Sequence, residues 1–142
     1  MNIALIGLGS MGYNLAKNMV SKNYQVNAFE KNMLIVENIK NDNIQNLYLL
    51  NSIQDLVDKT PSPRIIMLSL PADKIDKCIN DLIDHLNPTD IIADLGNSLY
   101  LKSMEREKLL SRFNISFLGI GVSGGPRGAK NGPAIMAGGS KI

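Results

Sequence analysis

The fold of this chain is decided near its N-terminus, in the stretch Ile3-Ala4-Leu5-Ile6-Gly7-Leu8-Gly9-Ser10-Met11-Gly12. Its leading apolar residues predict a short buried strand, and the residues after them have the spacing Gly-x-Gly-x-x-Gly. The chain then continues as a predicted helix to Ser21. On this helix Met11, Leu15 and Met19 recur at every fourth position and are expected to form the buried stripe.

A strand that leads through such a glycine turn into a helix is typical of dinucleotide-binding domains. Gly7 permits the tight turn, Gly9 lets the backbone approach a pyrophosphate, and Gly12 lets the helix pack closely on the strand. The helix N-terminus adds free N–H groups and a partial positive charge for the phosphates. We therefore expect a cofactor site in this turn, formed by Gly7, Leu8, Gly9, Ser10, Met11 and Gly12.

The rest of the chain alternates short apolar runs with helix-like stretches, as parallel α/β sheets do. Strands are expected at 25–29, 47–50, 64–68, 90–94 and 115–118, and helices at 33–40, 53–57, 72–86 and 99–112. The glycine-rich segment 119–139 is expected to be a loop. Together with the length of 142 residues, these patterns predict a single α/β domain over 1–142, with a Rossmann-type, doubly wound, mainly parallel sheet and helices on both faces.

Composition excludes several classes of function. The net charge of +2, from scattered basic residues, argues against nucleic acid or a membrane surface as partner. The single cysteine, Cys78, excludes an internal disulfide and a multi-cysteine metal site, and we expect it in the core. We expect no metal site, and His85 is expected at the surface. No signal peptide or membrane-spanning run is evident, so a cytoplasmic location is expected.

The end of the second predicted strand bears on the choice of cofactor. An acidic residue there accepts hydrogen bonds from the adenosine 2′-hydroxyl of NAD, whereas a cation favours the 2′-phosphate of NADP. The chain has both kinds of residue in sequence, Glu30 and then Lys31. These residues leave NAD and NADP both open as the cofactor.

Two later segments suggest a substrate side. Asp94-Leu95-Gly96-Asn97-Ser98 follows a strand, and the Asn97 amide can bridge a nicotinamide and a substrate. Alternatively, this segment is a plain helix start with Ser98 as its N-cap. In the segment 119–133, backbone amides and the Ser123 hydroxyl can hold an anionic substrate, and the alternative is a glycine-rich loop without a ligand.

Three motifs together resemble 6-phosphogluconate dehydrogenases in their order and spacing along the whole chain. They are Gly-Leu-Gly-Ser-Met-Gly-Tyr-Asn-Leu, Asp-Leu-Gly-Asn-Ser, and Gly-Val-Ser-Gly-Gly with Gly-Ala-Lys-Asn-Gly-Pro and Met-Ala-Gly-Gly after it. The resemblance implies oxidative decarboxylation of 6-phosphogluconate, a phosphorylated sugar acid, to ribulose 5-phosphate with NADP or NAD. It also implies site positions. The adenosine ribose would be surrounded by Glu30, Lys31 and Asn32, and the cofactor would run along Ser69, Leu70 and Pro71. The Asn97 side chain would touch both cofactor and substrate. The substrate would be held by Ser123, Gly124 and Gly125.

The chain departs from the family pattern at two places. The family usually has Asn-Arg-Thr at Glu30-Lys31-Asn32, and it often has two acidic residues at Pro126-Arg127. The second departure leans toward the related β-hydroxyacid dehydrogenases, which are the alternative enzyme class.

The family's catalytic lysine and acid, and its helical dimerisation domain, would lie beyond this chain. We therefore expect cofactor binding without turnover and assign no catalytic residue. The full-length family is homodimeric, and a monomer stays open for this chain. A non-catalytic nucleotide-binding module and a truncated fragment also stay open.

Overall fold

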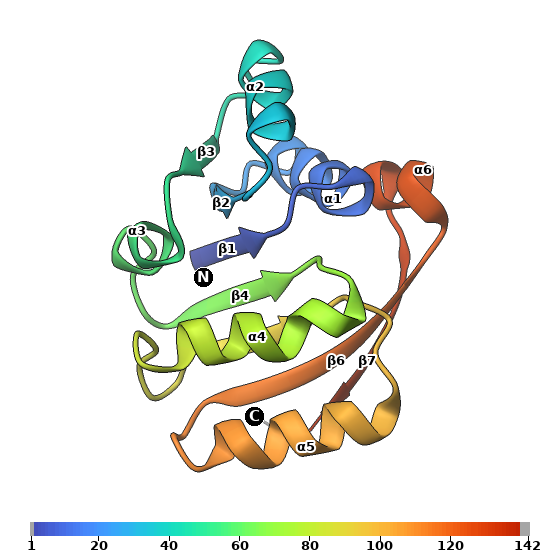
Figure 1. Cartoon of the computed structure of the whole chain (residues 1–142). Coiled ribbons are helices and arrows are strands. Elements are labelled where there is room, and N and C mark those ends of the chain that lie inside the picture. The colour runs from blue at the N-terminus through green and yellow to red at the C-terminus, as the bar shows by residue number, and fades with distance from the viewer. Residues whose placement is uncertain (1, 140–142) are drawn as a thin grey trace.

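The predicted strand–turn–helix unit is present in the computed structural model, which describes residues 2–139, as β1 (Asn2–Ile6) and α1 (Ser10–Ser21) (Figure 1). The other elements are β2 (Val26–Phe29), α2 (Met33–Asn41), β3 (Leu47–Leu50), α3 (Ile53–Asp58), β4 (Arg64–Leu68), α4 (Ala72–Ile83), β5 (Ile91–Asp94), α5 (Tyr100–Ser111), β6 (Ser116–Ser123), α6 (Gly125–Asn131) and β7 (Ala134–Gly139). The expected domain 1–142 includes Met1 and residues 140–142, which lie outside the described residues.

The strands within residues 2–139 join one seven-stranded sheet in the order β3-β2-β1-β4-β5-β6-β7. The strands from β3 to β6 pair in parallel, and β7 pairs antiparallel to β6. The chain leaves β1 toward β2 on one side and returns to β4 on the other, so the strand order reverses between β1 and β4. Ligands of doubly wound sheets bind at the carboxyl ends of the strands at such a switch point. The predicted mainly parallel α/β fold is confirmed.

Helices cover both faces of this sheet. On one face α3, α4 and α5 pack on the sheet, and α4 contributes Ile75, Ile79 and Leu82 to that core. On the other face Ala16 of α1 and Ile39 of α2 pack against β1 and β2.

None of the helices within residues 2–139 has the length and apolarity needed to cross a membrane.

The buried stripe predicted for α1 is wrong at Met11 and Leu15, whereas the partly buried Met19 does pack against the core. The buried residues of this helix are Gly12, Ala16 and Asn18, whereas Met11 and Leu15 are partly exposed. A Cβ added to Gly12 would lie 2.0 Å from the Gly7 carbonyl oxygen, so the helix lies too close to β1 for a large side chain on that side.

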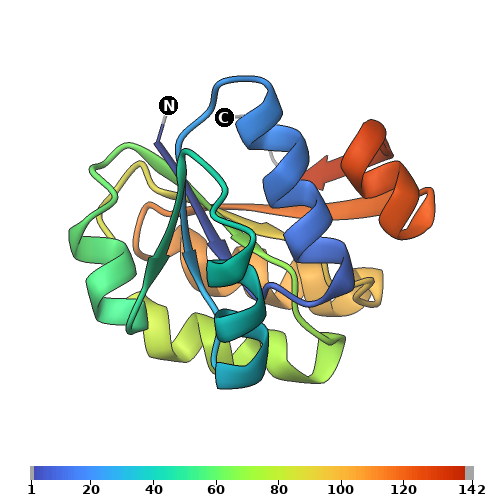
Figure 2. The same cartoon turned by 90° about the horizontal axis from the view of Figure 1, so that it is seen from above.

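The glycine-rich segment 119–139 is also not the loop that was predicted. The strand expected at 115–118 continues to Ser123 as β6, and the chain returns through α6 to form β7. Figure 2 shows α6 beside α1, and the amide nitrogen Nδ2 of Asn18 donates a hydrogen bond to the Lys130 carbonyl at 2.7 Å across that contact.

A buried ion pair holds the amino end of the sheet. Arg64 begins β4, and its Nε lies 2.8 Å from the Asp90 carboxylate; both side chains are almost completely buried. Arg64 also donates to the Thr60 carbonyl, and Asp90 accepts from the Ser62 hydroxyl and the Asn87 amide. These hydrogen bonds satisfy a pair of charges that would otherwise be costly to bury. The pair lies at the opposite end of the strands from the glycine turn.

The buried thiol of Cys78 provides a test of how α4 packs. Burial, with a smaller effect of the Asp81 charge, raises the pKa of Cys78 to about 12. Because the thiolate is the nucleophile, the native protein should react with a thiol reagent near pH ~8 at least about a hundredfold more slowly than the urea-unfolded protein.

The control is the Cys78→Ala protein with Asn80→Cys, which moves the thiol to an exposed position of α4. This protein should react at similar rates in the folded and unfolded states. Fast labelling of Cys78 in the folded protein would contradict the observed packing of α4.

Candidate functional site

The glycine turn is closed toward the protein and open toward solvent. Gly7 has a φ of +92°, and a Cβ there would lie 2.4 Å from the Ser69 carbonyl oxygen. Gly9 has an ordinary φ of −61°, and a Cβ built on it would have no atom of the described residues within 4 Å. The backbone at Gly9 is therefore accessible to a ligand, as a pyrophosphate-binding turn requires.

The N-terminus of α1 completes this cradle. The helix begins at Ser10 with Gly9 as N-cap, and among the described residues no side chain caps it. Its first turn carries no acidic residue. The exposed N–H groups and the positive end of the helix dipole are therefore available to an anion.

The segment after β4 lies against the glycine turn. The Ser69 amide donates to the Ile6 carbonyl at 2.8 Å, and the Leu70 side chain lies 2.8 Å from where a Gly7 Cβ would be. Pro71 is the N-cap of α4, which begins at Ala72 and ends at Ile83, before the predicted end of that helix. This segment therefore lies at the carboxyl end of β4, next to the switch point.

A cavity of about 380 Å³ brings several predicted site residues together. It is lined by Met11, Leu15, Ser69, Leu95, Asn97, Val122 and Gly125. The predicted residues in this set come from the glycine turn, the ends of β4 and β5, and the start of α6. Leu15, Leu95 and Val122 were not predicted as site residues; all three lie inside the quoted motifs, which was the available signal.

Ser123 and Gly124 lie outside the set that lines this cavity. Ser123 is exposed and ends β6, where it pairs with Ala134. Gly124 is the N-cap of α6 with a φ of +115°. Of the predicted substrate residues, Asn97 and Gly125 therefore share the cavity, and Ser123 and Gly124 lie on the chain directly before it.

Glu30, Lys31 and Asn32 lie together at the carboxyl end of β2. The Glu30 carboxylate accepts hydrogen bonds from the Leu8 and Asn32 amides at 2.7 and 2.8 Å. The Asn32 side chain caps α2 by accepting from the Leu34 amide at 3.0 Å, and Lys31 is exposed. The structure thus joins this predicted group to the glycine turn, on the side away from the cavity.

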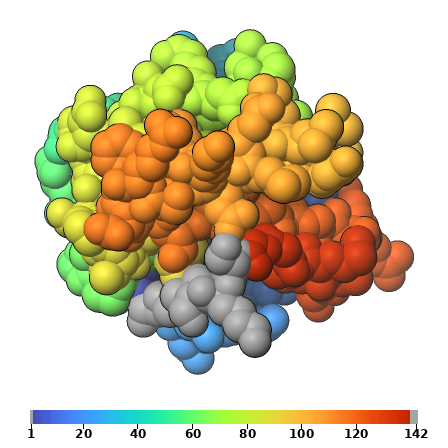
Figure 3. Space-filling view, turned by 90° about the horizontal axis from the view of Figure 1, so that it is seen from below, coloured from blue at the N-terminus to red at the C-terminus, as the bar shows by residue number. Residues whose placement is uncertain are grey.

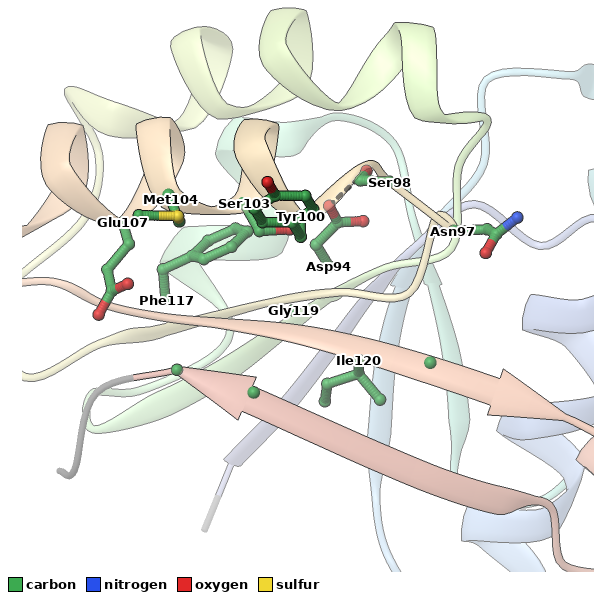
Figure 4. Close-up of a pocket in the computed structure, with 13 residues that line it drawn as sticks. Asp94, Asn97, Ser98, Tyr100, Ser103, Met104, Glu107, Phe117, Gly119 and Ile120 are labelled. Carbon is green, nitrogen blue, oxygen red and sulfur yellow. Dashed lines mark hydrogen bonds between the residues drawn. The ribbon is translucent and has the colours of Figure 1, made fainter.

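A buried charge network supports the turn that carries Asn97. The Asp94 carboxylate accepts from the Gly96 amide, the Ser98 hydroxyl and Arg106 Nη1 at 2.7–2.8 Å. Asn97 itself has a left-handed φ of +51°, and its side chain points away from Asp94 and Ser98 (Figure 4). Ser98 is therefore a member of this network and not the N-cap of α5, which is Leu99.

Arg106 joins α5 to α4 as well as to β5. Its side chain is 4% exposed, and its Nε lies 2.6 Å from the Asp76 carboxylate. The hydrogen bond from Arg106 lowers the pKa of Asp76 below its ordinary value. Arg106 was not predicted from the sequence, because its pairing with Asp76 joins two helices that are distant in the chain.

A second cavity, of about 360 Å³, lies between α5 and the β6–β7 pair (Figure 4). Tyr100, Met104 and Phe117 give it an apolar wall, and Glu107 lines its far end. Figure 3 shows this face of the molecule, with α5 beside residues of α6 and β7.

Within residues 2–139, no three His, Cys, Asp or Glu side chains cluster closely enough to hold a metal ion.

Comparisons with known proteins show the family of the chain. The family model described as the NAD binding domain of 6-phosphogluconate dehydrogenase matches residues 2–142. The decarboxylating 6-phosphogluconate dehydrogenase of Buchnera aphidicola is 40% identical over 141 residues, which are 98% of this chain and 30% of the relative. That of Staphylococcus aureus strain N315 is 41% identical with the same coverage. The chain thus spans about 30% of the length of these relatives.

Solved structures show the same relationship. Plasmodium falciparum 6-phosphogluconate dehydrogenase, described in its apo form and in complexes with NADP+ and with 6-phosphogluconate, superposes with a TM-score of 0.92 at 32% identity. The match covers 99% of this chain and 31% of that one. Mycobacterium tuberculosis 3-hydroxyisobutyrate dehydrogenase gives a TM-score of 0.85 at 22% identity over 98% of this chain and 46% of that one, which shows the shared fold.

The Arg106 network can be tested through stability. Arg106→Met leaves the Asp94 carboxylate buried without its cation, so the free energy of unfolding should fall by about 3–5 kcal/mol. Arg112→Met, which removes the same charge from the exposed C-cap of α5, should change it by less than about 0.5 kcal/mol.

Both values are measured by urea denaturation. Adding Asp94→Asn to Arg106→Met should restore part of the loss, because the buried charge is then gone. Equal stability of the Arg106→Met and Arg112→Met proteins would show that the network does not support this turn.

Proposed function

The chain belongs to the family of NAD-binding domains of 6-phosphogluconate dehydrogenase, and from this we propose that it binds a nicotinamide dinucleotide, NAD or NADP, across the switch point of its sheet. The open backbone at Gly9, beside an uncapped helix N-terminus, is the observation that carries the proposal. A pyrophosphate needs this combination of close approach and N–H donors.

The rest of the cofactor would extend in two directions from Gly9. Toward β2, the adenosine ribose would meet Glu30, Lys31 and Asn32. Toward β4 and β5, the nicotinamide end would pass Ser69, Leu70 and Pro71 and reach the cavity that Met11 and Asn97 line. The amide of Asn97, exposed and held in its turn by the Asp94 network, has the donors and acceptor to orient a carboxamide.

We propose further that the chain is the cofactor-binding part of a decarboxylating dehydrogenase acting on 6-phosphogluconate. A bound nicotinamide ring would take up a hydride from the substrate. The residues of this chain would bind and orient the cofactor and the substrate. On the substrate side these residues would be Asn97, Ser123, Gly124 and Gly125. No catalytic acid or base is assigned to them.

The likeness to hydroxyacid dehydrogenases extends to the fold alone, so a phosphorylated sugar acid is the proposed substrate.

The location and assembly of the protein belong to the same proposal. A cytoplasmic location and the family's homodimer are proposed for the complete enzyme.

The variant Gly9→Ala tests the cofactor site directly. Apart from its neighbours in the chain, the added methyl group meets no atom of residues 2–139 within 4 Å, so folding should be unaffected. Because the methyl group occupies the approach of the pyrophosphate, the Kd of both NADH and NADPH should rise at least about tenfold. The measurement is an equilibrium titration followed by nicotinamide fluorescence, with the free energy of unfolding measured in parallel.

Gly138→Ala is the matched control, because an added Cβ on this edge strand comes no closer than 3.9 Å to the Gly119 carbonyl oxygen. Its nucleotide affinity should equal that of the unaltered protein. If the folded, unaltered protein binds neither nucleotide, the proposed function is wrong. If Gly9→Ala binds both nucleotides normally, the pyrophosphate does not lie over Gly9.

A further inference from the structure

The Glu30 carboxylate has a fixed position in this structure. It follows β2 directly, and each of its oxygens accepts one backbone N–H: Oε2 from Leu8 at 2.7 Å and Oε1 from Asn32 at 2.8 Å. Leu8 is 1% exposed and belongs to the glycine turn. Hydrogen bonds to an ionised acceptor are stronger than those between neutral groups, so the carboxylate is held where the adenosine ribose of a bound dinucleotide would lie.

We infer that Glu30 makes this a site for the dinucleotide with a free adenosine 2′-hydroxyl, so that NADH binds in preference to NADPH. This inference rests on the proposed function and adds the choice of cofactor to it. An ionised carboxylate has about four lone-pair sites, and the observed hydrogen bonds use one on each oxygen. The remaining sites can accept a ribose hydroxyl, whereas a 2′-phosphate would bring like charges together.

The Glu30 carboxylate cannot turn away from a 2′-phosphate without losing hydrogen bonds. Moving it would break the hydrogen bonds to both the Leu8 and the Asn32 amides, and with them a link between the glycine turn and the start of α2. The neighbouring Asn32 side chain is already engaged as the N-cap of α2. Neither the Glu30 carboxylate nor the Asn32 side chain can therefore rearrange freely to accommodate a 2′-phosphate.

Lys31 is the residue that opposes this preference. It is exposed, and within residues 2–139 no carboxylate forms an ion pair with it. A lysine ammonium on a flexible, solvated chain is screened by salt and has no fork to bind a phosphate in a fixed geometry. The fixed acid therefore outweighs the mobile cation.

The test is to titrate the unaltered protein, Glu30→Gln and Glu37→Gln with NADH and NADPH separately. The unaltered protein should bind NADH at least about tenfold more tightly than NADPH. Glu30→Gln keeps the size of the side chain and removes its charge, so the ratio of the two Kd values should shift toward NADPH by at least about tenfold. Glu37→Gln removes the same charge from the exposed face of α2 and should leave the ratio unchanged.

The outcomes separate this inference from the proposed function. Equal or tighter binding of NADPH by the unaltered protein would overturn the inference while leaving the proposed function in place. A Glu30→Gln protein that loses affinity for both nucleotides to the same extent would show that Glu30 only braces the turn, and would also overturn it. If neither nucleotide binds the folded, unaltered protein, the proposed function fails and this inference fails with it.

Discussion

The contact between Gly12 and the Gly7 carbonyl is the constraint on which the rest of the site depends. It presses α1 against β1, so closely that an added Cβ would lie 2.0 Å from that oxygen. The buried side of α1 must then consist of small residues, and Met11 and Leu15 turn toward the cavity instead. The uncapped N-terminus of α1 lies at the carboxyl edge of the sheet, where an anion can reach it.

The cavity needs a second wall, and this wall is held by polar interactions. Arg106 links α4, α5 and the end of β5, which fixes the turn that carries Asn97 in its left-handed conformation. Asn18 links α1 to α6 and so brings Gly125 to the opposite wall. A buried cation with matched acceptors costs less than an unpaired one, and its hydrogen bonds specify one arrangement of the elements around it.

Local signals were sufficient to predict most of the sheet. The glycine turn and the apolar strands each depend on neighbouring residues, and the structure confirms them. The segment 119–139 was mispredicted because glycine disfavours strands, whereas β6 and β7 are stabilised by pairing with each other. Arg106 was missed because amphipathic periodicity assigns a charged residue to solvent, and its partners are distant in the sequence.

At the end of β2, residue types alone left the cofactor open, because an acid and a cation follow one another. Orientation distinguishes the two: Glu30 is anchored to the glycine turn, whereas Lys31 extends into solvent. Because the anchoring atoms include the amide of buried Leu8, the same carboxylate holds the glycine turn and would face the adenosine ribose of a bound dinucleotide. Replacing the acid would therefore change two properties at once, the charge at the end of β2 and the bracing of the glycine turn. In the proposed site, cofactor preference at this position is coupled to the glycine turn, so a full reversal toward NADP would need support for the Leu8 amide as well as loss of the Glu30 charge.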